Sequence, residues 1–165
     1  MNVIIRPLRE SDAYISYRWR NDKDVFALTT VVYNNDITLE MELNWIMRVI
    51  SNSNEHRCAI EVDGHYVGNI YLTGIDSKLA EYHIFIGDKS YWGRGVATEA
   101  SKQILEYAFE TLKLSKVYLE VRTENKNAIH LYNKLGFVKV GHKQGIDIME
   151  IPSERFYTIC KKDQL

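Results

Sequence analysis

The stretch Tyr91-Trp92-Gly93-Arg94-Gly95-Val96-Ala97-Thr98-Glu99-Ala100 decides the fold of this chain, because it joins an apolar strand to an amphipathic helix through a glycine-punctuated loop. Its two glycines allow tight turns and a close approach of the backbone to a ligand. The unpaired amides and positive dipole end of the following helix attract an anion, so the loop predicts a phosphate or pyrophosphate site. By itself, the pattern also fits a loop that only packs a helix closely.

Regular patterns on both sides of the loop predict a parallel strand pair. Apolar residues recur at helical spacing after the loop and predict a packed helix over residues 95–112. Tyr82 to Ile86 precede the loop as a strand, and Val117 to Val121 alternate apolar and polar residues as the next one. A strand, helix, strand crossover places the two strands side by side and parallel beneath the helix.

The remaining segments complete a mixed sheet with helices on both faces. In chain order we expect a strand over 2–6, a helix from Asp12 to Arg20 capped by Ser11, a helix capped by Thr38, a hairpin turning at Asp63-Gly64, a helix from Lys126 to Leu135 stopped by Gly136, and strands Phe137–Val140 and Phe156–Ile159.

Composition favours one ordinary globular domain over residues 1–165. The chain is 45% hydrophobic and 26% charged, with a net charge of -1, which argues against a nucleic-acid partner. No stretch approaches the roughly 18 apolar residues of a membrane span, and the apolar run at Met1 is too short for a signal peptide. Cys58 and Cys160 lack metal-site spacing and predict buried thiols, hence a cytoplasmic, reducing location with no membrane partner.

The strand before the loop carries polar residues on one face. Glu81, His83 and Phe85 share that face, and the opposite face is apolar. A strand in a sheet covered by helices is ordinarily apolar on both sides, so a carboxylate and an imidazole indicate a cleft. A solvated strand end for Glu81 and a structural role for His83 remain the alternatives.

A second motif lies one strand further along, from Asn125 to Phe137. Together with the loop, it resembles the signature of the GNAT superfamily of acetyl-CoA-dependent N-acetyltransferases over about residues 60–140. The positions that match N-x-x-A-x-x-x-Y-x-K-x-G-F are Asn125, Ala128, Tyr132, Lys134, Gly136 and Phe137. Trp92 departs from the family, whose members often carry Gln or Arg there. The loop is similar to that of the branch that includes ribosomal-protein N-terminal acetyltransferases.

The resemblance implies a fold, a coenzyme and a mechanism. The fold is a mixed, mostly antiparallel sheet whose one parallel pair splays apart to admit acetyl-CoA and an amine, with no metal. Glu81 would accept the amine proton, directly or through a water, and Tyr132 would protonate the departing thiolate. The implied coenzyme contacts are backbone groups of Phe85 and Ile86, amides of Gly93, Arg94, Gly95, Val96, Ala97 and Thr98, and the side chain of Asn125.

The acceptor amine is less constrained by the sequence. Trp19 and Arg20 could stack on and pair with a nucleotide-linked amino sugar, next to His83. The Trp-Arg-Asn stretch is also weakly similar to acetyltransferases of pseudaminic-acid biosynthesis. A buried Trp19 with solvated arginines is the structural alternative. Protein N-terminal acetylation and a non-catalytic coenzyme-binding module are the other functions considered, for a monomer or homodimer.

Overall fold

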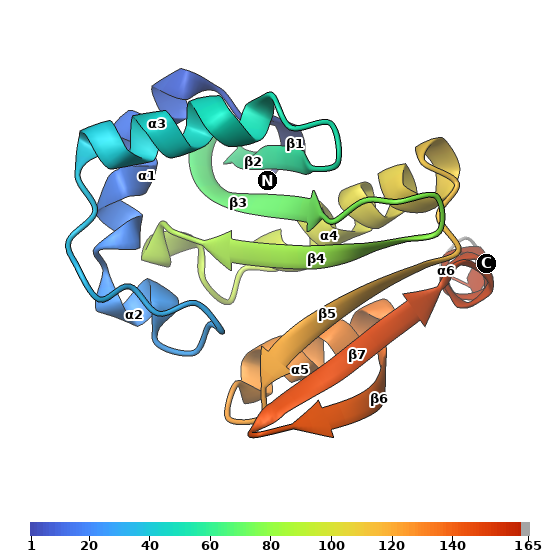
Figure 1. Ribbon diagram of the computed structural model, residues 1–165. Coiled ribbons are helices and arrows are strands. Elements are labelled where there is room, and N and C mark those ends of the chain that lie inside the picture. The colour runs from blue at the N-terminus through green and yellow to red at the C-terminus, as the bar shows by residue number, and fades with distance from the viewer. Residues whose placement is uncertain (163–165) are drawn as a thin grey trace.

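A seven-stranded sheet in the order β1-β2-β3-β4-β5-β7-β6 forms the centre of the computed structural model, which describes residues 1–162 (Figure 1). The last three residues of the expected domain, 163–165, lie outside the described residues. The strands are β1 (Val3–Pro7), β2 (His56–Val62), β3 (His65–Thr73), β4 (Leu79–Ile86), β5 (Lys116–Arg122), β6 (Val138–Lys143) and β7 (Ile146–Pro152). The helices are α1 (Ala13–Arg20), α2 (Lys23–Phe26), α3 (Leu39–Ile50), α4 (Val96–Glu106), α5 (Lys126–Leu135) and α6 (Ser153–Lys162), with short 3-10 turns at Glu10–Asp12 and Lys89–Tyr91 and a π-helical turn at Tyr107–Thr111.

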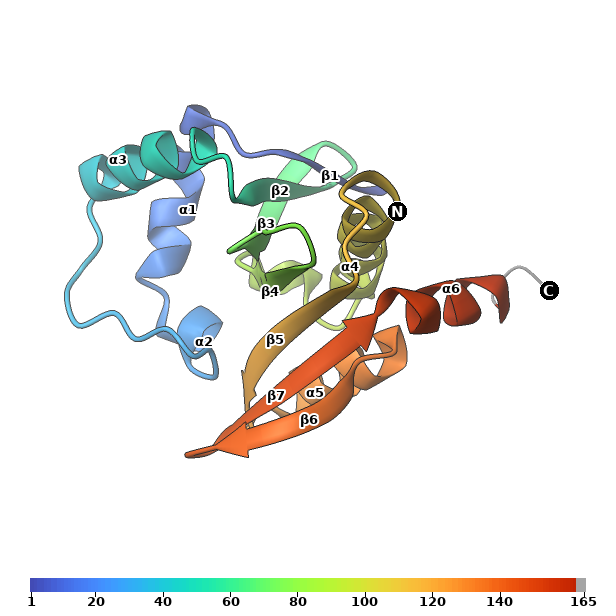
Figure 2. The same ribbon diagram turned by 45° about the vertical axis from the view of Figure 1, so that its right-hand side comes forward.

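Helices cover both faces of the sheet, as predicted (Figure 2). Alternate residues of β2 show why: Cys58 and Ile60 lie in the core that includes α4 residues, whereas Ala59 lies in a second core with Ile46 of α3. A strand that is buried on both sides needs apolar residues at successive positions, and β2 has them.

The parallel pair β4–β5 is joined along only part of its length. Its register ends at Glu81 opposite Tyr118, although β4 continues to Ile86 and β5 to Arg122. Figure 1 shows the two strands meeting on the right and diverging toward the left. All other neighbouring strand pairs within residues 1–162 are antiparallel. The predicted mixed, mostly antiparallel sheet with a splayed parallel pair is therefore confirmed.

Local signals predicted several elements correctly. The Thr38 hydroxyl accepts a hydrogen bond from the Met41 amide at 3.2 Å and caps α3. The hairpin between β2 and β3 turns at Asp63 and Gly64, whose φ angles of 50° and 83° suit a type I′ turn. The helix α5 ends at Gly136 with φ 102°, as its sequence indicates.

The predicted strand Phe156–Ile159 is wrong, because these residues lie in α6. Phe156 packs there on Phe109 with 5.0 Å between ring centroids. The strand that pairs with β5 is instead β7, which begins after a turn at Gln144-Gly145 with φ angles of 49° and 77°. This turn has the same conformation as Asp63-Gly64 and is the signal that sequence analysis missed.

Two further expectations about the N-terminal region and the thiols need correction. Ser11 does not cap α1, since the chain enters that helix through a 3-10 turn in which the Asp12 carboxylate accepts from the Arg9 amide. Cys58 is buried, which raises the pKa of its thiol to about 12, but Cys160 on α6 is only partly buried. Within residues 1–162, the helices are too short or too polar to cross a membrane.

Candidate active site

A cavity of about 440 Å³ opens where β4 and β5 diverge. It is bounded by the polar face of β4, by the end of β5, by α5, and by the excursion between α1 and α3, which is residues 22–36. Its lining residues are Arg20, Phe26, Leu28, Thr29, Thr30, Val31, Tyr33, Trp45, Glu55, Arg57, Tyr71, Thr73, Glu81, Tyr82, His83, Ile84, Phe85, Glu120, Val121, Arg122, Asn125 and Tyr132.

The floor of this cavity is one face of β2, β3 and β4. Strand register places Tyr71 between His83 and Arg57, and Thr73 opposite Glu81. Residues paired across neighbouring strands project from the same face, so this row of side chains faces the cavity together. The predicted polar face of β4 thus becomes part of a polar surface that extends over three strands.

Glu81 and His83 lie in the cavity with opposite pKa shifts. Burial raises the pKa of the Glu81 carboxyl above its usual range, and the charge of Glu120 acts in the same direction. Burial lowers the pKa of His83 to about 4, as does the charge of Arg57. The His83 Nε2 atom is 2.9 Å from the Thr73 hydroxyl and 3.7 Å from Glu81 Oε2. At neutral pH the site therefore offers a neutral imidazole beside a carboxylate with increased proton affinity.

Tyr132 reaches the same cavity from α5. Its ring packs edge-on against Tyr82 and Phe137, each with centroids 5.8 Å away. Burial raises the pKa of the Tyr132 hydroxyl to about 12, so it stays protonated at neutral pH. Among residues 1–160 this hydroxyl has no hydrogen-bond partner, and the side chain lines the cavity. It is therefore available as a donor to a bound molecule.

The two glycines of the loop before α4 have left-handed backbone conformations. Gly93 and Gly95 have φ angles of 69° and 80°, and neither has a neighbouring atom within 4 Å of the place of a Cβ. Glu99 donates to the Gly95 carbonyl at 3.2 Å, and α4 begins without a side-chain cap. The amides of its first turn, from Val96 to Thr98, lack intrahelical partners and can bind an oxyanion.

Two predicted coenzyme contacts are engaged within the chain. The Trp92 indole donates from Nε1 to the Ile86 carbonyl at 2.9 Å, although its side chain is otherwise largely exposed. The Asn125 side chain accepts from the Ala128 amide at 3.2 Å and donates to the Leu28 carbonyl at 3.3 Å. Asn125 thus caps α5 and also fastens the excursion 22–36 to the far side of the cavity.

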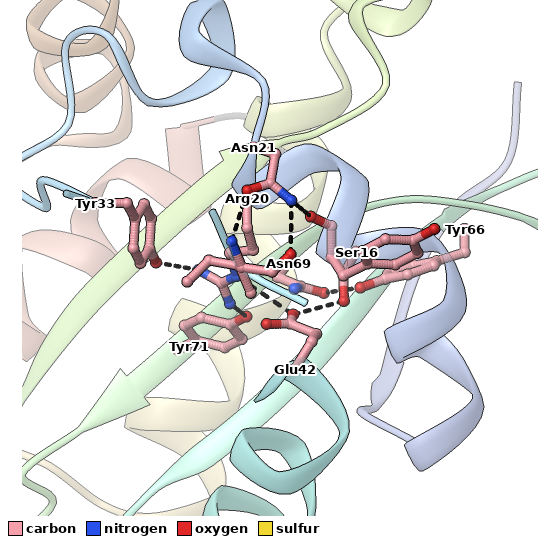
Figure 3. Close-up of polar contacts among 10 residues, drawn as sticks. Ser16, Arg20, Asn21, Tyr33, Glu42, Tyr66, Asn69 and Tyr71 are labelled. Atoms are coloured by element: carbon pink, nitrogen blue, oxygen red, sulfur yellow. Dashed lines mark hydrogen bonds and ion pairs between the residues drawn. The ribbon is translucent and has the colours of Figure 1, made fainter. Parts of the chain in front are cut away.

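Arg20 lines the cavity but its guanidinium is paired inside the chain (Figure 3). It contacts the Glu42 carboxylate at 3.3 Å, the Tyr33 hydroxyl at 2.8 Å and the Tyr71 hydroxyl at 3.4 Å. The same Glu42 oxygen accepts from Ser16 at 2.6 Å. Such a buried, mutually satisfied group holds α1, α3 and the sheet in register.

Trp19 does not line the cavity. Its indole is buried, with ring centroids 4.7 Å from Tyr66 in a tilted contact and 6.2 Å from Phe85 in an edge-on contact. It fills the space that Gly87 leaves by lacking a Cβ. Of the three residues expected to bind the acceptor, His83 and Arg20 line the cavity and Trp19 supports it from outside. The alternative of a buried Trp19 with solvated arginines is therefore correct for Trp19, but Arg20 is buried rather than solvated.

Sequence analysis missed the aromatic and basic wall of the cavity, in particular Tyr33, Trp45 and Arg57. The Asp63-Gly64 turn makes the register of the β2–β3 hairpin predictable, and this register places Arg57 opposite Tyr71. The position of Arg57 could therefore have been found from the sequence. Tyr33 and Trp45 gave no comparable signal, because the excursion 22–36 that carries Tyr33 and the helix α3 that carries Trp45 reach the cavity only by packing against the rest of the chain. The two ends of the excursion are tied by Asn21, which exchanges two hydrogen bonds of 2.8 Å with the backbone of Ile37.

The fold and the site together define a GNAT-like α/β protein, with a glycine loop before a helix and a cavity at the splayed strand pair. No group of three His, Cys, Asp or Glu side chains in the described part of the chain is arranged to hold a metal ion.

Comparison with known proteins identifies the family. The acetyltransferase (GNAT) domain model matches residues 2–138. Spermidine N(1)-acetyltransferase of Escherichia coli (strain K12) is 34% identical over 139 residues, covering 82% of this chain and 73% of that protein. The Vibrio cholerae protein of the same name is 35% identical over 144 residues, covering 85% and 81%. The chain therefore belongs to the GNAT acetyltransferase family.

Solved structures agree with the fold. Spermidine N-acetyltransferase from Vibrio cholerae, in complex with CoA and spermine, superposes with a TM-score of 0.86. The alignment covers 94% of this chain and 98% of that one, with 24% sequence identity.

Proposed function

We propose that this protein is an acetyl-CoA-dependent N-acetyltransferase that acetylates a primary amine of a small molecule. The observation that carries the proposal is the position of Glu81, the last residue of β4 paired with β5, in one cavity with Tyr132. A base and an acid thus flank the place where the strands separate.

Residues of this chain fit the acetyl donor. The unpaired first-turn amides of α4 and the open surroundings of Gly93 and Gly95 suit the pyrophosphate. Beyond Glu81 no strand within residues 1–162 pairs with the edge of β4 that faces β5. Backbone groups at Phe85 and Ile86 would pair there with the pantetheine arm once the Trp92 indole releases the Ile86 carbonyl. When bound, acetyl-CoA supplies an acetyl group activated as a thioester.

The proton transfers are assigned to Glu81 and Tyr132. An alkylammonium has a pKa of about 10 and no lone pair, so the amine must lose a proton before it attacks. The Glu81 carboxylate, with its raised pKa, would accept that proton directly or through a water. The Tyr132 hydroxyl would give its proton to the leaving sulfur, whose conjugate acid has a pKa of about 8.5. His83, neutral and held by Thr73, would orient the amine.

The acceptor belongs to one of several amine classes. Polyamines are candidates because the curated relatives are named spermidine N(1)-acetyltransferases. A nucleotide-linked amino sugar and a protein N-terminus are the classes that the sequence motifs suggest. The cytoplasmic location and the oligomeric state stay predictions.

The test is thiol release from acetyl-CoA with a panel of amines from these classes. We expect Glu81→Gln and Tyr132→Phe each to lower kcat by about 100-fold or more while coenzyme affinity is retained. Activity of the unaltered protein should decline as the pH falls through the raised pKa of Glu81, since only the carboxylate accepts a proton. Tyr14→Phe, at an exposed position on α1, is the control. Unchanged turnover in both active-site variants, on any accepted amine, would show that the assignment is wrong.

A further inference from the structure

Arg57 presents an available guanidinium to the acceptor side of the cavity. Its Nε donates to Glu55 Oε2 at 2.7 Å, and this is the hydrogen bond it makes among residues 1–160. Its guanidinium carbon lies 4.3 Å from the ring centroid of Tyr71 and 5.1 Å from that of Trp45. The two rings and Glu55 hold the guanidinium in one plane, and its terminal nitrogens have no hydrogen-bond partner among residues 1–160.

The terminal nitrogens are not sealed in the interior. The Arg57 side chain is only 13% exposed. In the described chain, the side-chain nitrogen or oxygen that is fully buried without a hydrogen-bond partner is Asn69 Nδ2, so the terminal nitrogens of Arg57 keep some contact with solvent. Arg57 is one of the residues that line the cavity, so a molecule bound there lies within reach of its side chain. A planar fork with two unused donors matches the geometry of a carboxylate or a phosphate.

Arg20 differs from Arg57 although both contact Trp45. The Arg20 guanidinium lies 4.5 Å from the Trp45 ring, but it is paired with Glu42, Tyr33 and Tyr71. It therefore has little capacity for a ligand. Of these two guanidinium groups, Arg57 makes fewer hydrogen bonds within the chain and so has more donors left for an anion.

Three carboxylates line the cavity, those of Glu55, Glu81 and Glu120. Glu55 is engaged by Arg57, and Glu42 by Arg20. The carboxylates left to the cavity are the proposed base Glu81 and the exposed Glu120. A polyamine, which carries several positive charges, would therefore meet one carboxylate outside these ion pairs besides the proposed base.

We propose that Arg57 binds an anionic group of the acceptor, a carboxylate or a phosphate, so that the amine substrate carries both a reacting amine and an anion. This inference rests on the acetyl transfer proposed above. Arg57 and His83 are two strands apart, which corresponds to about 10 Å between their Cα atoms. The amine and the anion therefore belong to one compact acceptor whose length is of this order. Amino sugars with a phosphate and small amino acids are acceptors of that size.

Matched acceptor pairs test the proposal. O-phosphoethanolamine is compared with ethanolamine, glucosamine 6-phosphate with glucosamine, and 4-aminobutyrate with butylamine, with spermidine as the polycation. The unaltered protein should prefer at least one anionic partner by about tenfold in kcat/KM, and the preferred pair separates phosphate from carboxylate. Arg57→Met should lower kcat/KM for the preferred anionic acceptor by about 10- to 100-fold. It should change kcat/KM for the matched acceptor without the anionic group by less than about threefold. Arg48→Met, exposed on α3, is the control.

Failure of this inference is distinguishable from failure of acetyl transfer. If no amine is acetylated, calorimetric binding of O-phosphoethanolamine and 4-aminobutyrate to the unaltered protein and to Arg57→Met still tests the anion site. Binding that is lost in the variant supports the site, and equal or absent binding overturns it. Arg57→Lys replaces Arg57→Met if the latter fails to fold, since it keeps the charge but loses the fork. A preference for spermidine that the substitution leaves unchanged also overturns the proposal.

Discussion

The two sides of the cavity are built in different ways. The side proposed for the acetyl donor is made of backbone groups within short segments, namely the glycine loop and the free edge of β4. The side proposed for the acceptor is made of long side chains from α1, the excursion 22–36, α3 and β2, which meet only in the folded chain. A donor common to a whole family can be held by backbone, whereas selection of one amine requires side chains.

Because one side is made of backbone groups and the other of side chains, substitutions should affect the two sides at different kinds of residue. Backbone groups are changed only through the conformation of the chain, so the donor side is sensitive at its glycines. The acceptor side depends on buried charges that stabilise one another, so the loss of one leaves another without a partner.

The largest expected effect is on the acceptor side, from Glu42→Ala. This change leaves the buried Arg20 guanidinium without its carboxylate, and we expect the free energy of unfolding to fall by about 3–5 kcal/mol. Urea denaturation measures it. Glu40→Ala, exposed on the same helix, should change the value by less than about 0.5 kcal/mol. CoA affinity measured under native conditions should be unchanged within about twofold; a large loss would show that the two sides are not separable.

Gly95→Ala should disrupt coenzyme binding on the donor side, with a smaller free-energy effect than Glu42→Ala. An alanine at φ 80° is strained by about 1–2 kcal/mol, and the loop relaxes by moving its amides. Calorimetry should show CoA binding weakened by about tenfold. Gly64→Ala is the matched control, because its φ of 83° and open surroundings impose the same strain on a distant hairpin. It should lower stability similarly and leave CoA binding unchanged. Equal CoA affinities for both variants would argue against a nest at Gly95.

Asn125→Asp has the smallest expected effect and tests how the two sides are joined. The aspartate keeps the oxygen that caps α5 but cannot donate to the Leu28 carbonyl, a loss of about 1 kcal/mol. Steady-state kinetics should show the KM for the amine raised about fivefold, with the melting temperature nearly unchanged. Asn133→Asp, exposed on α5, is the control. A change in the KM for acetyl-CoA alone would assign Asn125 to the donor side, as the family resemblance implies.

Local sequence signals predicted the elements around the splayed pair. The Asp63-Gly64 turn, the cap at Thr38 and the stop at Gly136 were each correct because each depends on residues within one turn of chain. A short apolar segment such as Phe156 to Ile159 is compatible with a strand or with a helix. Packing of Phe156 on Phe109 resolves the ambiguity in favour of a helix.

The candidate site was predictable in part. Glu81, His83 and Tyr132 were identified from the strand pattern and the family motif, and the fold brings all three to one cavity. Trp19 and Arg20 were chosen because aromatic and guanidinium groups are good ligands, but the sequence could not show that one is buried and the other paired with Glu42. The hairpin register makes the position of Arg57 opposite Tyr71 predictable, but a single arginine in a strand does not by itself indicate a ligand site.

The sequence by itself determined the mixed sheet, the glycine loop and the family motif, because each is encoded in residues that are neighbours along the chain or recur with a fixed period. Only the tertiary structure decided which arginine is available to a ligand. That property depends on the partners that surround each guanidinium, and Glu42, Tyr71 and Trp45 come from separate segments that folding alone brings together.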